Sequence, residues 1–237
     1  MKNDYCDVNS ISSFPKWTFL DAALWKGLPN NSRFVTGEAR LWAYKAAWLH
    51  YNRDRVINYA EREKIPVLLL AGVAITEVAG TPERFKAYGV LQFYQLRDYF
   101  ESSGSTISNK TSVGSIAIQL RAAAEVLNID ASKLTTTQQL QLANCLLGDD
   151  FNIDVAAKHL KSLILFDNPG LFDAREIDDE LIILAASRYN RGIERKKEDF
   201  ISSLRAPVGS LSRKYTSYGR SMIEKKDTIM DILGVDK

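Results

Sequence analysis

Residues 65–80 read IPVLLLAGVAITEVAG, an apolar run that ends in one carboxylate, Glu77. Pro66 suits the first turn of a helix, and Gly80 suits the position after its end. The stretch therefore predicts a helix of roughly three to four turns with Glu77 near its carboxyl end.

Glu77 shares a helical face with Leu70, Val73 and Ala74. Burial on such a face disfavours the ionised carboxylate, and so does the negative end of the helix dipole. The sequence thus predicts a raised pKa for Glu77, the property that a general acid needs near neutral pH. The alternative is a solvated carboxylate that marks where a core helix reaches water, the commoner role of carboxylates at helix ends.

The composition is that of a globular protein. Of 237 residues, 46% are hydrophobic and 25% are charged, enough to bury a substantial core. The formal net charge of +2 is too small to predict nucleic-acid binding. Residues 1–16 lack the pattern of a secretory signal, and no stretch approaches about 18 uninterrupted apolar residues, so neither an export signal nor membrane insertion is expected.

Cysteine and histidine are scarce. Cys6 and Cys145 lie far apart in the sequence, so we expect neither a disulfide framework nor a zinc site. His50 and His159 are the only histidines, which argues against histidine-based metal sites and Ser–His triads. The sequence predicts no metal and no cofactor.

Helical periodicity recurs every 15 to 25 residues, and strand patterns are scarce. A polar, glycine-containing stretch at 101–112 predicts a loop. The expected fold is mostly α, with a small irregular or β-containing region near 101–115. Other helices are predicted near 19–26, 37–63, 88–100, 135–147, 152–166, 178–192 and 217–233. Residues 113–127 are predicted to form a tight entry followed by a helix.

Four stretches follow one another in an informative order. They are the apolar helix that ends at Glu77, TSVGSIAIQ at 111–119, FNIDVAAKHLKSL at 151–163 and LAASRYNRG at 184–192. Together they resemble the lysozyme-like family of soluble lytic transglycosylases and goose-type lysozymes, over about residues 60–220. The family has an apolar helix that ends in the catalytic glutamate, a Ser-containing turn with Gln, and an Ala-Tyr-Asn-x-Gly segment.

The chain also departs from that family pattern. Val78 follows the glutamate where the family usually has Ser. Gly114 lies five residues before Gln119, where the family usually has three. Arg121 stands where goose-type lysozymes carry an aspartate. The family-like second carboxylate is therefore not identified, and Glu83, Asp98 and Glu101 are the candidates for it.

Ser, Asn and Pro separate short aromatic clusters in residues 1–35, so we expect a loop-rich N-terminal cap there. The resemblance implies that residues 36–237 form a lysozyme-like catalytic domain. It implies that Glu77 cleaves the bond between N-acetylmuramic acid and N-acetylglucosamine as acid and then base. Ser112 and Gln119 would bind the sugar and its N-acetyl group. Tyr189 would hold Glu77 or stack on a sugar ring, and Asn190 would order the backbone nearby. The alternatives are a helix cap for Ser112, a solvated Gln119 and an ordinary helix ending at Tyr189 and Asn190.

The leading functional hypothesis is a lytic transglycosylase that acts on peptidoglycan as a monomer. The alternatives are a hydrolytic muramidase with an unidentified second carboxylate, and a non-catalytic helical module that binds glycan or protein. Because the substrate lies outside the cytoplasm and no signal peptide is visible, we expect an antibacterial effector or a phage lysis enzyme. An effector would be delivered by a contact-dependent apparatus, such as type VI secretion, into the periplasm or cell wall of a target cell. An immunity protein that plugs the cleft is the expected partner of such an effector.

Overall fold

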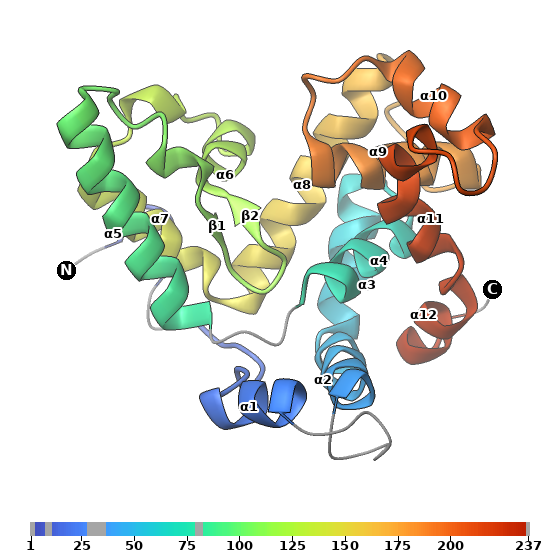
Figure 1. Ribbon diagram of the computed structural model, residues 1–237, viewed down its shortest axis with the longest axis horizontal. Helices are drawn as coiled ribbons and strands as arrows, with labels where there is room; N and C mark the ends of the chain where they lie inside the picture. The colour runs from blue at the N-terminus through green and yellow to red at the C-terminus, as the bar shows by residue number, and fades with distance from the viewer. Residues whose placement is uncertain (1–2, 8–10, 28–36, 79–82, 236–237) are drawn as a thin grey trace. The chain divides into compact units, whose positions relative to one another are not determined.

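The computed structural model describes residues 3–7, 11–27, 37–78 and 83–235 (Figure 1). This part of the chain is mostly helical and contains a small two-stranded antiparallel sheet. The predicted fold class, mostly α with a small β-containing region, is confirmed. The chain forms two compact units, one of residues 1–52 and 77–156 and the other of residues 53–76 and 157–237. The predicted domain boundary near residue 35 lies outside the described residues.

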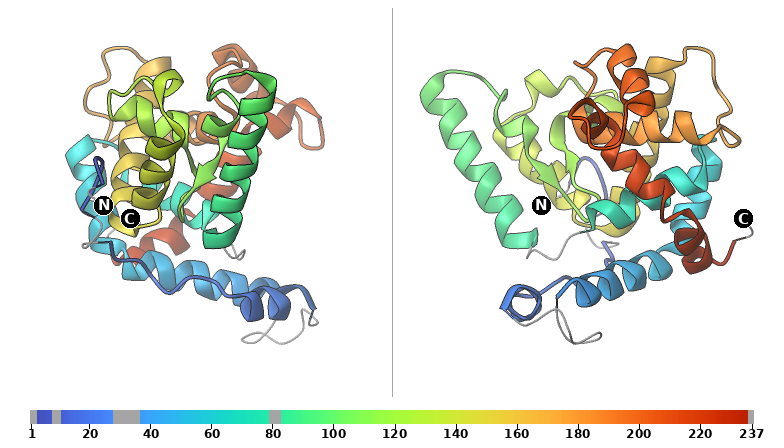
Figure 2. Two further views of the ribbon diagram at one scale, coloured as in Figure 1. Left: turned by 90° about the vertical axis from the view of Figure 1, so that its left-hand side faces the viewer. Right: turned by 45° about the vertical axis from the view of Figure 1, so that its right-hand side comes forward.

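The first unit carries the sheet and surrounds it with helices, and α5 lies beside the first strand (Figure 2). A capping box starts α7, because Thr135 accepts a hydrogen bond from the backbone of Gln138 while the Gln138 side chain accepts from the backbone of Thr135. The elements are α1 (Phe19–Gly27), α2 (Gly37–Tyr51), α5 (Glu83–Glu101), η2 (Ser108–Lys110), β1 (Ser112–Val113), β2 (Ile118–Gln119), α6 (Leu120–Val126), η3 (Ala131–Lys133), α7 (Thr136–Leu146) and the start of α8 (Asp149–Asp167).

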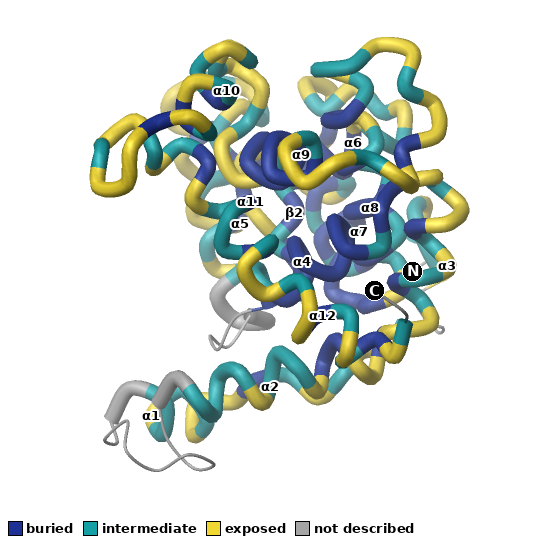
Figure 3. Tube along the Cα trace, turned by 90° about the vertical axis from the view of Figure 1, so that its right-hand side faces the viewer, coloured by how far each residue is buried: buried dark blue, intermediate teal, exposed yellow. Residues whose placement is uncertain are grey.

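The second unit is built on two buried helices, α4 and α9 (Figure 3). A Cβ atom at Gly219 would lie 2.5 Å from the carbonyl oxygen of Ile183, so only glycine allows α11 to approach α9 this closely. The elements are α3 (Arg53–Glu63), α4 (Val67–Glu77), the rest of α8, α9 (Asp179–Arg191), α10 (Lys197–Arg205), η4 (Ser212–Thr216), α11 (Ser217–Ile223) and α12 (Lys226–Leu233).

Two predicted helices are each divided in the structure. The continuous helix predicted over 37–63 breaks at Asn52, whose buried side chain donates to the Trp48 carbonyl at 3.2 Å and to Asp149 at 3.2 Å. The helix predicted over 217–233 is divided between Ile223 and Lys226. The helical spacing of apolar residues continues through both breaks, so the sequence predicted one continuous helix in each place. It did not reveal α10 either.

Cys6 and Cys145 form a disulfide bond in the first unit, across 139 residues of sequence. The expectation that these cysteines give no disulfide framework was therefore wrong. Their separation in the sequence carries no information about their distance after folding. No helix within the described residues is long and apolar enough to cross a membrane.

Candidate active site

Glu77 is the last residue of α4, as the sequence predicted. Every residue from Leu68 to Ile75 is buried, whereas Glu77 is half-buried. Thr76 donates its hydroxyl to the Gly72 carbonyl at 2.7 Å, and Val78 directly after the helix is 1% exposed. Glu77 is therefore partly exposed at the end of a helix whose residues 68–75 are buried, and the next residue along the chain, Val78, is buried as well.

The β1–β2 hairpin brings two of the predicted sugar-binding residues together. Ser112 pairs with Gln119, and Val113 pairs with Ile118. Residues opposite one another in an antiparallel pair point to the same face. Val113 and Ile118 are buried on one face, so the other face presents an exposed Ser112 and a half-buried Gln119. The hairpin thus offers a hydroxyl and an amide side by side.

Gly114 explains the long spacing before Gln119. It begins the turn that joins the two strands, with a φ of +84°, a value that suits glycine. A Cβ atom here would lie 2.3 Å from the Leu146 carbonyl oxygen and 2.4 Å from Asn152. Asn152 also accepts the backbone N–H of Ile116 at 2.8 Å. The turn that begins at Gly114 is therefore hydrogen-bonded to Asn152 at the start of α8, and this turn accounts for the long spacing between Gly114 and Gln119.

Gln119 is oriented by a neighbouring cation. Its side-chain oxygen accepts a hydrogen bond from Nε of Arg121 at 2.7 Å. Arg121 therefore places a positive charge beside the Gln119 amide. Because the oxygen of Gln119 is engaged, its NH₂ group is the part that can donate to a ligand carbonyl.

Asp149 holds the hairpin turn and was missed by sequence reasoning. This carboxylate is fully buried and accepts hydrogen bonds from Ser115 Oγ at 3.0 Å, Asn52 at 3.2 Å and the Phe14 backbone at 2.6 Å. Lys16 lies 3.5 Å away. The only sequence signal was an acidic first turn before an amphipathic helix, which is a common helix start.

The candidates for a second carboxylate differ in their surroundings. Asp98 is 4% exposed and accepts the backbone N–H groups of Ile107 and Ser108 at 2.9 and 2.8 Å, and the Ser103 hydroxyl at 2.7 Å. Burial alone raises the pKa of Asp98, but the hydrogen bonds from Ser108, Ser103 and Ile107 outweigh it and lower the pKa. Asp98 is thus an ionised group that holds the loop after α5.

The other two candidates for a second carboxylate are Glu101 and Glu83. Glu101 is exposed and pairs with Arg97 at 2.6 Å. The side chain of Glu83 lies outside the described part of the structure. Within the described residues, no group of three His, Cys, Asp or Glu side chains could hold a metal ion.

Tyr189 and Asn190 belong to the second unit, whereas Glu77, Ser112 and Gln119 belong to the first. Tyr189 is half-buried at the end of α9, with its ring 5.6 Å from that of His159, and Asn190 is exposed. Gly192 ends this helix with a φ of +80°, a backbone conformation that suits glycine.

Arg188, which sequence reasoning missed, braces the end of α9. It is 1% exposed and donates through two nitrogens to Asp167, each at 2.8 Å. Its guanidinium also lies 4.8 Å from the centre of the Phe200 ring. This buried pair connects the ends of α8 and α9 one residue before Tyr189.

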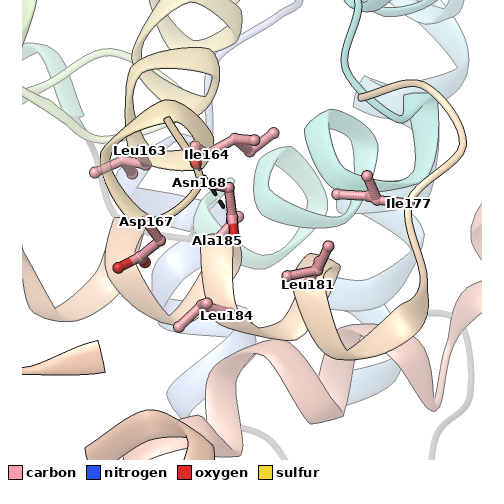
Figure 4. Close-up of a pocket in the computed structure, with 8 residues that line it drawn as sticks. All are labelled: Leu163, Ile164, Asp167, Asn168, Ile177, Leu181, Leu184 and Ala185. Atoms are coloured by element: carbon pink, nitrogen blue, oxygen red, sulfur yellow. Dashed lines mark hydrogen bonds between the residues drawn. The ribbon is translucent and has the colours of Figure 1, made fainter. Parts of the chain in front are cut away.

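An apolar hollow lies between α8 and α9 in the second unit (Figure 4). Its volume of about 180 Å³, part of it open solvent, is smaller than a typical small-molecule site. Its one carboxylate, Asp167, is engaged by Arg188. The residues that line it are Leu163, Ile164, Asp167, Asn168, Ile177, Leu181, Leu184 and Ala185. None of the predicted site residues lines this hollow.

The first unit thus combines a half-buried carboxylate at a helix end with a braced hairpin that presents a hydroxyl and an amide. A carboxyl group can transfer a proton, and a hydroxyl and an amide can bind a polar ligand such as a sugar. No protein-family model, curated protein or solved structure matches this chain.

Proposed function

We propose that this protein is a lytic transglycosylase that cleaves peptidoglycan between N-acetylmuramic acid and N-acetylglucosamine. The observation that carries the proposal is Glu77, half-buried at the end of the buried helix α4 and followed along the chain by the Ser112–Gln119 hairpin. This order of a carboxylate and then a Ser- and Gln-bearing turn is the one that resembles the lysozyme-like family.

In the first step, the protonated carboxyl of Glu77 gives its proton to the glycosidic oxygen. The bond between that oxygen and C1 of the muramic acid then breaks, and the N-acetylglucosamine end leaves as an alcohol. The remaining sugar passes through an oxocarbenium-like state.

In the second step, the Glu77 carboxylate removes the proton from the C6 hydroxyl of the same muramic acid. The C6 oxygen bonds to C1 and gives a 1,6-anhydro sugar, while Glu77 regains its proton. No water is consumed, so one carboxyl group serves as acid and base.

Ser112 and Gln119 are the proposed sugar-binding groups. The Gln119 NH₂ group donates to the carbonyl of an N-acetyl group, and the Ser112 hydroxyl donates to or accepts from a sugar hydroxyl. The roles predicted for Tyr189 and Asn190 belong to the same proposal, and Tyr189→Phe tests the role of Tyr189.

Transglycosylation is favoured over hydrolysis by the surroundings of Asp98. A hydrolase needs a second carboxylate to act as nucleophile or to activate water. Asp98 is instead buried and occupied by three hydrogen bonds. Hydrolysis and a non-catalytic binding role are outcomes that the following test distinguishes.

The deciding test compares Glu77→Gln with the parent on purified cell-wall sacculi. We expect the rate of digestion to fall by at least about a hundredfold, because the general acid is lost. Glu125→Gln is the matched control, since Glu125 is an exposed glutamate on α6 of the same unit. Equal digestion by Glu77→Gln and the parent would show that Glu77 is not catalytic.

Mass spectrometry of the released fragments then identifies the reaction. A transglycosylase gives anhydro-muramic acid ends, whereas a hydrolase adds one water to each cleaved bond. A protein that binds sacculi without releasing fragments would be a binding module.

The setting of the proposed activity follows from its substrate. We propose that the protein acts in the periplasm or cell wall of a target cell, as a delivered effector or a phage lysis enzyme. An effector requires protection of its producer, so its immunity protein would inhibit digestion of sacculi when added in equimolar amount.

A further inference from the structure

The N-terminal arm, which we define as residues 3–7 and 11–17, is fastened to the first turn of α8. The backbone N–H of Asp149 donates to the Ser12 carbonyl at 3.0 Å, and the Asp149 carboxylate accepts from the Phe14 backbone at 2.6 Å. Asn3 adds a bond of 2.9 Å to the Gln141 carbonyl on α7. The arm is therefore held by reciprocal backbone and side-chain hydrogen bonds within the first unit.

Lys16 extends the arm to the hairpin of the candidate site. Its ammonium group donates to Ser115 Oγ at 2.7 Å and lies 3.5 Å from the Asp149 carboxylate. Ser115 is 3% exposed in the turn between β1 and β2 and itself donates to Asp149 at 3.0 Å. Lys16, Ser115 and Asp149 thus form one polar cluster at the turn that joins the strands carrying Ser112 and Gln119.

The Cys6–Cys145 disulfide ties this arm covalently to α7. Cys145 is fully buried, and its carbonyl accepts the N–H of Gly148 at 3.0 Å, just before Asp149. The bond therefore joins the arm to the chain four residues before the carboxylate that anchors the arm. With the bond intact, release of Phe14 and Lys16 leaves them tethered close to Asp149, so they rebind readily.

We infer that the disulfide makes the N-terminal arm a redox-dependent brace for the hairpin, with Lys16 as a positioning residue. A dithiol reductant would convert the bond to two thiols by transferring two electrons and two protons, and would itself become a disulfide. Loss of the tether would weaken the contact of Lys16 with Ser115 and loosen the hairpin. The brace would be complete only in an oxidising compartment, where such bonds persist.

The effect of the brace on catalysis rests on the proposed function, but its effect on the hairpin does not. The first measurement is therefore amide hydrogen exchange of residues 112–119 in the full chain, with and without dithiothreitol. We expect reduction to speed this exchange at least about tenfold. Cys6→Ser should exchange at the fast rate and be insensitive to the reductant, and Lys16→Met should exchange faster than the oxidised parent.

Ser13→Ala is the matched control, because Ser13 is an exposed residue of the same arm. In this variant, amide hydrogen exchange of the hairpin should match that of the parent when the disulfide is oxidised and should become faster on reduction. Hairpin exchange in the parent that does not change on reduction would overturn the inference.

Digestion of sacculi is the second measurement. We expect reduction of the parent, or Lys16→Met, to lower the rate about tenfold. If the oxidised parent digests sacculi and reduction leaves that rate unchanged, the brace does not act on the site. If no form digests sacculi, the proposed function fails, while hydrogen exchange still decides whether the brace exists.

Discussion

Ser115 donates a hydrogen bond of 3.0 Å to the buried carboxylate of Asp149, which joins the hairpin turn to the first turn of α8. The same carboxylate accepts from Phe14 and Asn52. One side chain therefore connects segments that lie far apart in the sequence. Several donors that are buried with it would lose their partner if it were removed.

Asp149→Ala should lower the free energy of unfolding by about 3 kcal/mol, because it leaves buried donors without an acceptor. Urea denaturation followed by circular dichroism measures this change. Asp150→Ala is the matched control, since Asp150 is an exposed residue in the same helical turn. A similar loss in both variants would mean that the helix dipole, and not the buried network, is responsible.

The stability contributed by Asp98 should depend on pH. Its pKa is lowered from the ordinary value of 3.8, so folding favours the ionised form. The contribution is present above pH 3.8 and is lost as the pH falls through the lowered pKa of the folded state. Asp98→Asn should therefore be less stable than the parent by about 2 kcal/mol at pH 7. Urea denaturation at pH 7, 5 and 3 should show the difference shrink in acid, and a constant difference would contradict this linkage.

Arg188 and Asp167 should show strong coupling, because both side chains are almost fully buried. Arg188→Met should cost about 3 to 5 kcal/mol of unfolding free energy, since it leaves the carboxylate buried without its cation. Adding Asp167→Leu should recover part of that loss. A double-mutant cycle by chemical denaturation measures the coupling, and additive effects would show that the pair is not coupled.

Gly114→Ala should destabilise the protein by about 3 kcal/mol or more, because the new methyl group meets the Leu146 carbonyl in a strained backbone conformation. Gly104→Ala separates the two causes. Gly104 also has a positive φ of +63°, but nothing lies within 4 Å of a Cβ atom there. Its alanine variant should lose only about 1 kcal/mol in thermal or urea denaturation. Equal losses of stability in the two variants would show that backbone strain alone, and not the contact with Leu146, causes the destabilisation of Gly114→Ala.

Gln119→Ala should lower the rate of sacculus digestion about tenfold without changing the melting temperature, because it removes a half-buried donor from the hairpin face. Tyr189→Phe tests the role predicted for the Tyr189 hydroxyl, because it removes only that hydroxyl and leaves the ring. Lys110→Ala, at an exposed residue just before β1, should digest sacculi at the parental rate. Loss of activity in the lysine variant as well would point to a general disturbance of this region.

The local features of the fold were readable from the sequence. The apolar run up to Glu77 and the acidic start and glycine stop of α9 each specify an element through neighbouring residues. Helical periodicity and capping act over a few residues, so the sequence contains them directly. The breaks at Asn52 and after Ile223 were missed because the helical pattern continues across them.

The sequence by itself thus determined a mostly helical protein with one carboxylate at the end of a buried helix. Only the tertiary structure decided that Cys6 reaches Cys145, that Asp149 holds the hairpin turn, and that Ser112 lies opposite Gln119. The first two contacts join residues 34 or more positions apart. The third depends on a strand register that Gly114 and Asn152 fix together. Such contacts form only when burial brings distant segments together, and spacing along the chain does not encode that distance.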